Sequence, residues 1–263
     1  ESGIRVAIAL GRAWHEMDDV IDAMPCLRYF VCTNGAYVMD KEGKKELVHI
    51  SFDKTRAIDL VRKLMTYGVF VEAYVKAEIF GQYPTVGNET LQAERFFRPN
   101  IRPFILKTRT MVPDLLAHLE SLPEGPEKIQ IFYGDERIRE RILADLRDDF
   151  QGAATDGKGR ERFYDVLESS EGNLEFVLPH TTKGTAVEAL ANHWGYTPDE
   201  VMTIGDSEND LSMIRFAGAS VAMGNARDNV KAAARYETTD NNNYGVARAL
   251  YSAIAHNREL EGK

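Results

Sequence analysis

Cysteine is scarce in this sequence. The two cysteines among 263 residues, Cys26 and Cys32, provide neither a disulfide framework nor the ligands of a structural zinc site. Cys32 lies in an apolar run and Cys26 follows a proline, so we expect both to be packing residues. Reduced packing cysteines fit a reducing compartment, and we therefore expect a cytoplasmic protein.

Long apolar runs and an excess of positive charge are missing as well. No run approaches the ~18 residues that cross a bilayer, and no secretory signal pattern occurs in the printed residues. The net charge of −9 repels nucleic acid phosphates unless a basic patch opposes it. The candidate patch, residues 158–162, is short and contains glycine, which favours a solvated loop. We expect no membrane and no nucleic acid among the partners.

The composition that is present is ordinary for a globular protein. Apolar residues make up 44% of the chain and charged residues 28%. The length allows one large or two modest domains. From residue 181 onward, strand-like and helix-like segments alternate, which is typical of a parallel sheet with crossover helices. Residues 51–181 instead group helices with consecutive strands, which is typical of helices on one face of an antiparallel sheet.

We therefore predict an α/β fold in which a doubly wound parallel-sheet domain is interrupted by an inserted α+β domain. The first domain would comprise residues 1–50 and 182–263, and the insert residues 51–181. Within the insert, Ser51 is the expected N-cap of a helix, and we assign no element to residues 84–107.

The chain is organised around residues 201–214, which read VMTIGDSENDLSMI. An apolar run that ends at Gly205 predicts a buried strand, and apolar residues then resume at helical spacing. Asp206 and Asp210 would lie between strand and helix, at the edge where open α/β sheets bind ligands. Mg²⁺ takes one or two carboxylates together with water and substrate phosphate, so this pair suits it. The two aspartates could equally cap the positive end of the helix, and the residues alone leave both readings open.

A serine nucleophile is a further interpretation of the same stretch, because Ser207 follows a Gly-Asp turn. Such an enzyme needs a histidine base that is held by a third group. His256 is the only histidine after this point, in a solvent-facing pattern, and no G-x-S-x-G elbow occurs in the sequence. The sequence therefore disfavours an esterase of this kind.

Lys183 stands at the expected start of the helix that precedes this strand. The helix dipole disfavours a cation there, whereas a bound phosphate would reverse the preference, with the ammonium as its partner. The alternative is a solvated surface lysine. Gly11-Arg12, after one strand and before a helix, either offers backbone N–H groups to an anion or is an ordinary turn.

Asn34-Gly35 and Asn225 follow two further expected strands. If the sheet is parallel, the carboxyl ends of all these strands share one edge, and the polar groups that follow them would converge. Carboxylates, a lysine, glycine amides and asparagines in one place suit phosphoryl transfer with Mg²⁺.

Beyond this pattern, four segments stand out: GDSENDLSMI, TKGTAVEAL, AMGNARDNVKAAARY and YGVARAL. In these segments the sequence resembles a known family, the Cof-type haloacid-dehalogenase-like hydrolases. The resemblance implies a Rossmann-like core with a large α/β cap domain. It also implies Mg²⁺-dependent hydrolysis of small phosphate monoesters through a phosphoaspartyl intermediate, with sugar phosphates as the favoured class. We expect a monomer or a homodimer.

The resemblance also implies roles for individual residues. Asp206 would bind Mg²⁺ with Asp210 in support, and Lys183 would hold the phosphate and the charge of the nucleophile. The residues that would contact the phosphoryl group or lie in its pocket are Leu10, Gly11, Arg12, Asn34, Gly35 and Asn209.

Two departures from the family pattern bear on activity. Leu10 stands where the family has threonine or serine, so a hydroxyl that would donate to phosphate is replaced by an apolar side chain. The D-x-D-G-T motif, which supplies the nucleophile and the acid/base aspartate, has no counterpart in the printed sequence. We expect the nucleophile on a strand upstream of Glu1, and we expect the printed chain alone to be inactive. The competing hypothesis is a non-catalytic relative that binds a phosphorylated ligand.

Overall fold

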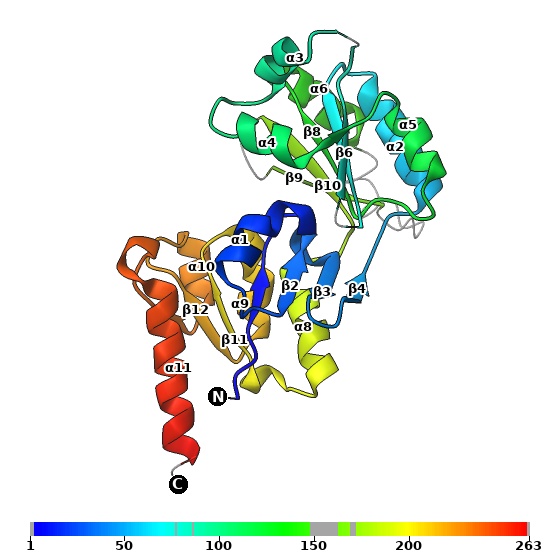
Figure 1. The fold of residues 1–263 in the computed structure, drawn as a ribbon. Coiled ribbons are helices and arrows are strands. Elements are labelled where there is room, and N and C mark those ends of the chain that lie inside the picture. Colours follow the sequence, from blue (N-terminus) through cyan, green and yellow to red (C-terminus); the bar gives the residue numbers. More distant parts are fainter. Residues whose placement is uncertain (1–2, 77, 86, 148–162, 169–171, 262–263) are drawn as a thin grey trace, which may run out of the picture. The chain divides into compact units, whose positions relative to one another are not determined.

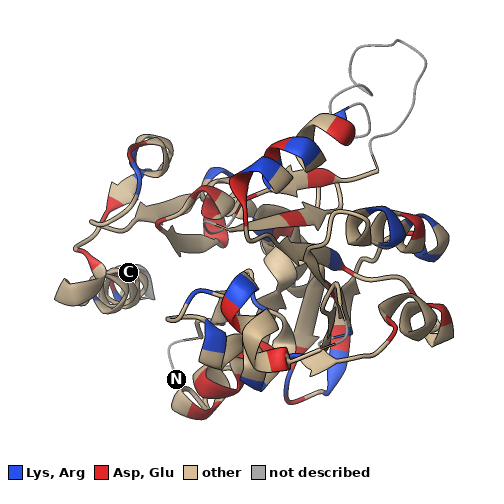
Figure 2. Cartoon of the chain, turned by 90° about the horizontal axis from the view of Figure 1, so that it is seen from above, with Lys and Arg blue, Asp and Glu red and all other residues tan. Residues whose placement is uncertain are grey.

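The computed structural model in Figure 1 describes residues 3–76, 78–85, 87–147, 163–168 and 172–261. The basic run at 158–162 lies outside these residues. Within them, no helix is both long and apolar enough to cross a bilayer. Acidic and basic residues are interspersed along the described helices (Figure 2).

The chain forms two compact units. The first comprises Glu1–Gly11, Cys26–Val48 and Thr181–Lys263, and the second comprises Arg12–Pro25 and His49–His180. The boundaries near residues 50 and 181 lie within two residues of those that we expected from the sequence. The division differs from the expected domains by placing Arg12–Pro25 with the second unit.

One sheet of the first unit has the strand order β1-β2-β3-β4. β1 (Ala7–Ala9) pairs in parallel with β2 (Tyr29–Cys32). β2 pairs antiparallel with β3 (Tyr37–Asp40), and β4 (Lys45–His49) is the last strand of this sheet. The first strand is thus part of a parallel pair, as the sequence predicts.

A second sheet of the same unit consists of β11 (Met202–Gly205), β12 (Ala219–Ala222) and β13 (Tyr236–Glu237), all parallel. Among the described strands, β1 and β11 are each the outer strand of their own sheet, and they do not pair with one another. Each therefore has one hydrogen-bonding edge with no described strand beside it.

The helices of the first unit lie between and after these strands. They are α8 (Lys183–Trp194), α9 (Leu211–Phe216), α10 (Asp228–Ala233) and α11 (Gly245–Glu261). α8 begins at its N-cap Thr182, whose side chain accepts a hydrogen bond from the backbone N–H of Thr185. It ends at Gly195, whose φ of 75° is left-handed and suits glycine. Strands in parallel pairs with helices between them are the α/β arrangement that we predicted.

The second unit is built on a six-stranded sheet with the order β7-β6-β5-β8-β10-β9. Neighbouring strands are antiparallel, except that β6 and β7 are parallel. The strands are β5 (Phe70–Val75), β6 (Glu78–Gln82), β7 (Thr110–Met111), β8 (Lys128–Phe132), β9 (Asp165–Leu167) and β10 (Asn173–Val177). This largely antiparallel sheet matches the one expected for the insert.

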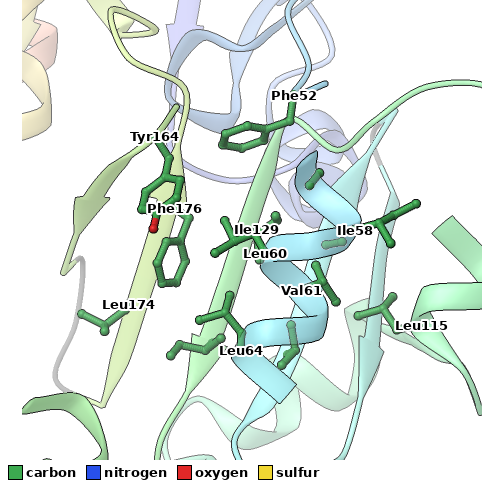
Figure 3. Close-up of a cluster of buried hydrophobic side chains, with 14 of the residues drawn as sticks. Phe52, Ile58, Leu60, Val61, Leu64, Leu115, Ile129, Tyr164, Leu174 and Phe176 are labelled. Atoms are coloured by element: carbon green, nitrogen blue, oxygen red, sulfur yellow. The ribbon is translucent and has the colours of Figure 1, made fainter. Parts of the chain in front are cut away.

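One face of this sheet is covered by α2 (Lys54–Met65), α5 (Leu115–Ser121) and α6 (Glu136–Asp145). Buried residues of α2 such as Leu60 and Leu64 recur at helical spacing and face the strands (Figure 3). The sequence predicts these helices because that spacing is regular.

The opposite face is covered by α3 (Glu89–Phe96) and α4 (Arg102–Thr108), whose side chains pack around Phe70. The expectation of helices on one face only is therefore wrong. α3 lies within residues 84–107, to which the sequence assigned no element, and α4 lies within them except for its last residue, Thr108. They are short, and Phe97, directly after α3, packs on Phe70 with 4.9 Å between the ring centroids.

The start of α2 also corrects a prediction. Its N-cap is Asp53, whose Oδ1 accepts a hydrogen bond of 2.9 Å from the backbone N–H of Arg56. Ser51 lies two residues too early for this role. An aspartate and a serine are both good caps, and the sequence alone does not rank them at this spacing.

The segment Arg12–Pro25 contains η1 (Trp14–Met17) and α1 (Asp18–Ala23). It contacts the rest of the second unit through buried charges. The guanidinium of Arg109 donates from Nη1 to Glu16 Oε1 at 2.5 Å and from Nε to Glu72 Oε2 at 3.0 Å. Burial disfavours the charged guanidinium and lowers the pKa of Arg109. The electrostatic interactions with Glu72, Tyr74 and Glu16 are stronger together, so the pKa is raised above its ordinary value. The segment is thus fixed to the second unit by a desolvated ionic contact.

Candidate active site

The first part of the site is the turn that follows β11. Asp210 Oδ2 accepts hydrogen bonds from the backbone N–H groups of Asp206, at 2.9 Å, and Ser207, at 3.0 Å. A Cβ at Gly205 would lie 2.6 Å from the Cβ of Asp210, so only glycine fits where the strand ends. Asp210 therefore holds the turn that presents the side chain of Asp206.

Lys183, the first residue of α8, is buried beside this turn. Its Nζ donates to Asp210 Oδ1 at 2.6 Å, and the two side chains are only 7% and 6% exposed. The alternative of a solvated surface lysine is therefore wrong. Both oxygens of Asp210 accept from nitrogen donors, which makes this carboxylate a structural partner of Lys183 and of the turn.

Asp206 is half-buried, and its carboxylate accepts fewer hydrogen bonds than that of Asp210. Its Oδ2 accepts from Asn225 Nδ2 at 3.0 Å, and its Oδ1 accepts from Ser207 Oγ at 3.3 Å. A carboxylate has about four lone-pair sites, so Asp206 keeps acceptor capacity for another ligand. Of the two aspartates, Asp206 is the one with oxygen atoms available for a cation.

A third loop, η2 (Thr33–Gly35), meets this turn from β2. Asn209 Nδ2 donates to Asn34 Oδ1 at 3.1 Å, and the backbone N–H of Asn34 donates to Leu10 O at 3.1 Å. A Cβ at Gly35 would lie 2.2 Å from Thr182 O, which brings the loop directly against the start of α8. The loops after β1, β2 and β11 and the start of α8 thus meet in one place.

The structure brings together most of the residues that the sequence singled out. Those joined by these contacts within the first unit are Leu10, Gly11, Asn34, Gly35, Lys183, Asp206, Asn209 and Asp210. Leu10 takes part through its backbone. Arg12 instead belongs to the second unit, where its exposed guanidinium lies 3.5 Å from Asp19 Oδ1 and over the ring of Phe104. The role of Arg12 in the phosphate pocket stays a prediction from the sequence.

The hydroxyl of Ser207 donates to Asp206, so it is held by a carboxylate instead of by an imidazole base. His256 is an exposed residue of α11. These positions do not form the serine, histidine and acid arrangement that an esterase requires.

A divalent metal ion needs oxygen or nitrogen donors from side chains that lie close together. No group of three or more His, Cys, Asp or Glu side chains in the described part of the chain is arranged to hold a metal ion. Mg²⁺ needs fewer protein ligands, because it keeps several waters and is bound through one or two carboxylates plus substrate phosphate. A partly occupied carboxylate at Asp206, next to a turn stabilised by Asp210, fits that requirement.

One residue of the site was placed at a strand end by the sequence but given no role. Asn225 follows β12, and its contact with Asp206 joins the strands β11 and β12 at their carboxyl ends. The signal for it was only its place after a strand, since side-chain partners are not visible in a sequence.

Comparisons with known proteins bear on this site and fold. A family model described as haloacid dehalogenase-like hydrolase matches residues 1–250. The chain belongs to the haloacid dehalogenase-like hydrolases. The resemblance noted in the sequence and the predicted α/β class are thereby confirmed.

Individual relatives extend over nearly the whole chain. Phosphatase YwpJ from Bacillus subtilis is 29% identical over 257 residues, which cover 94% of this chain and 87% of that protein. A crystal structure of a haloacid dehalogenase-like hydrolase from Bacteroides thetaiotaomicron is 27% identical with a TM-score of 0.77, and covers 95% of this chain and 87% of that one. The subclass IIB sugar phosphatase BT4131 shares the fold, with a TM-score of 0.70 at 19% identity over 96% of this chain and 86% of its own.

Proposed function

We propose that the protein is a Mg²⁺-dependent phosphatase of small phosphorylated metabolites. The observation that carries this proposal is the buried pair of Lys183 and Asp210 beside the partly free carboxylate of Asp206. A cation and a metal-binding carboxylate next to one another are what a phosphoryl group needs for charge stabilisation. The similarity to a phosphatase over 94% of the chain supports the same reaction class.

Each residue has a definite task in this proposal. Lys183 holds negative charge on the phosphoryl group from a buried position, where the low dielectric strengthens its effect. Asp206 holds the cation, which when bound supplies neutralisation of the phosphoryl oxygens. Asp210 fixes Lys183 and the turn, while Asn209 and the backbone at Gly11 face the same place through Asn34.

The reaction in this proposal passes through a phosphoaspartyl intermediate, and its nucleophile would be an aspartate on a strand between β1 and β11. The free edges of β1 and β11 support this, since a parallel strand placed between them would join the two sheets of the first unit. Its carboxyl end would then share the edge at which Asp206 lies.

Sugar phosphates are the proposed substrate class, and one neighbour in fold is named a sugar phosphatase. A small phosphorylated molecule is the proposed partner. Location in the cytoplasm and a monomeric or homodimeric state stay predictions from the sequence.

A second candidate is a non-catalytic protein that binds a phosphorylated ligand, and the apolar side chain of Leu10 favours it, because Leu10 cannot donate a hydrogen bond to phosphate. A screen of phosphate esters with the full-length gene product, with Mg²⁺ and with a chelator, separates the two. Turnover that requires Mg²⁺ and falls by roughly 10²-fold or more in Lys183→Met supports the phosphatase. Binding of inorganic phosphate without turnover of any ester supports the second candidate.

A further inference from the structure

We propose that Asn225 is a positioning residue, whose side-chain amide fixes the orientation of the Asp206 carboxylate for a divalent cation. This inference rests on the proposed role of Asp206. The amide of Asn225 lies between two groups of opposite character. Its Nδ2 donates to Asp206 Oδ2 at 3.0 Å, and its Oδ1 accepts from the backbone N–H of Asn241 at 3.0 Å.

These two contacts determine which way the amide points. An ionised carboxylate can only accept hydrogen bonds, and a backbone N–H can only donate one. The flipped amide would face Asp206 with its oxygen and Asn241 with its nitrogen, and it would lose both hydrogen bonds. Asn225 therefore has one orientation, and it offers a single fixed donor to Asp206.

Asn241, whose backbone N–H donates to Asn225 Oδ1, is itself held in place. Asn241 lies in η6 (Asn241–Asn243), where the carboxylate of Asp240 accepts from the backbone N–H of Asn242 and the side chain of Asn243. Close approach of the backbone adds to this: a Cβ at Gly224, next to Asn225, would lie 2.7 Å from the backbone nitrogen of Asp240. The amide of Asn225 is thus anchored on the segment between β13 and α11.

These contacts fix the orientation of the Asp206 carboxylate before a cation binds. One of its oxygens is held by Asn225 and the other by Ser207, so the plane of the carboxylate is set by two donors. The remaining lone pairs then point in fixed directions, and binding a cation does not require this side chain to be ordered anew. Loss of a residue that orients a metal ligand typically weakens metal affinity by about 10–100-fold.

The chain offers a matched control in Asn229. It is also an exposed asparagine, and its Nδ2 donates to a carboxylate of the same turn, Glu208 Oε1, at 3.2 Å. Glu208 is not proposed to bind the cation. Removing either amide deletes one exposed hydrogen bond to a carboxylate of this turn, and removing that of Asn225 also deletes the bond from the N–H of Asn241. Only the loss of Asn225 should change the cation site.

The experiment is calorimetric titration of Mg²⁺ into the full-length protein and into Asn225→Ala, Asn225→Leu, Asn229→Ala and Asp206→Asn. We expect both Asn225 variants to bind Mg²⁺ about 10–100-fold more weakly than the parent, with melting temperatures close to that of Asn229→Ala. Asn229→Ala should bind Mg²⁺ like the parent.

Two different failures can be told apart. If Asp206→Asn binds Mg²⁺ like the parent, the cation site is elsewhere and the proposed role of Asp206 is wrong. If Asp206→Asn loses binding while the Asn225 variants match Asn229→Ala, Asp206 keeps its role and the positioning role of Asn225 is overturned. Weakened binding that is accompanied by a large fall in melting temperature, absent in Asn229→Ala, would also overturn it, because the effect would then be structural.

Discussion

The ammonium of Lys183 lies 2.6 Å from Oδ1 of Asp210, and both side chains are almost completely buried. A buried ion pair compensates two charges that have each lost their water. Removal of one partner leaves the other charge buried and uncompensated. This costs more free energy than the replacement of both partners by apolar residues. The pair is therefore a point where stability and the proposed chemistry depend on the same residues.

Asp210→Ala is expected to lower the free energy of unfolding by about 3–5 kcal/mol, the usual effect of breaking a buried ion pair. It leaves Lys183 without its partner and the turn without the acceptor for two N–H groups. The control is Glu42→Ala, which removes an exposed carboxylate that lies 3.0 Å from Arg28, and should change stability by less than about 1 kcal/mol. Chemical denaturation measures both, and equal effects would contradict the burial argument.

The two aspartates are expected to differ in what they do for Mg²⁺. Asp206→Asn should weaken Mg²⁺ binding by more than the ~10–100-fold typical of residues that only orient a ligand. Asp210→Asn should weaken it less and should mainly lower stability, because the oxygens of Asp210 already accept from Lys183 and from the turn. Calorimetric titration combined with thermal unfolding of both variants tests this. The reverse order of affinities would place the cation at Asp210.

Gly35 has a left-handed φ of 108° and no room for a side chain, since a Cβ would lie 2.2 Å from Thr182 O. Gly195 also has a positive φ, of 75°, but open space around it. Gly195→Ala should lower stability by about 1–2 kcal/mol through backbone strain alone. Gly35→Ala should cost about 1–3 kcal/mol more, because the loop must also move away from α8. Similar melting temperatures of the two variants would show that the loop at Gly35 can move away from α8 at little cost in free energy.

Asp40 gives the protein a pH dependence in the acid range. The hydrogen bond from Arg28 lowers the pKa of Asp40 from 3.8 to about 2, against the opposing effect of burial. Because the folded-state pKa lies below that of the unfolded chain, the ionised carboxylate stabilises the fold above about pH 4, and this contribution is lost as the pH falls toward 2. The stability difference between the parent and Asp40→Asn should be constant near neutral pH and shrink over that window in denaturant titrations. A difference that stays constant down to pH 2 would contradict the lowered pKa.

The place of the site was predictable because it follows from strand topology. Asp206 and Asn34 each follow the end of a strand, and Lys183 begins the helix that precedes a strand. Parallel strands bring such positions to one edge of the sheet, where these residues meet. The pairing within the site was not predictable. That Asp210 gives both oxygens to nitrogen donors depends on side-chain geometry, and a sequence reports only that two carboxylates are near one another.

The errors in the second unit have a similar origin. α3 and α4 are short, and their buried residues Phe96 and Ile105 belong to a cluster with Phe70, which lies far away in the sequence. Local periodicity therefore does not reveal them. The helices α2 and α6 have regular apolar spacing and were found. Arg12 was assigned to the first domain because it follows Gly11, but its segment belongs to the second unit. There Glu16 accepts a hydrogen bond from Arg109, which lies 93 residues further along the chain.

The ionic contact between Glu16 and Arg109 also has a consequence for cooperative unfolding. The N–H of Ala13 donates to Glu16 Oε2 at 2.8 Å, so the start of η1 is tied to a carboxylate that is itself held by the second unit. Protection against hydrogen exchange follows cooperative units of structure, not stretches of sequence. The amides around Ala13 should therefore share the exchange behaviour of β5 and β8, although their neighbours on both sides along the chain, in β1 and β2, belong to the first unit. In terms of foldons, the chain leaves the first unit after Gly11, passes through the second as Arg12–Pro25, and returns to the first at Cys26.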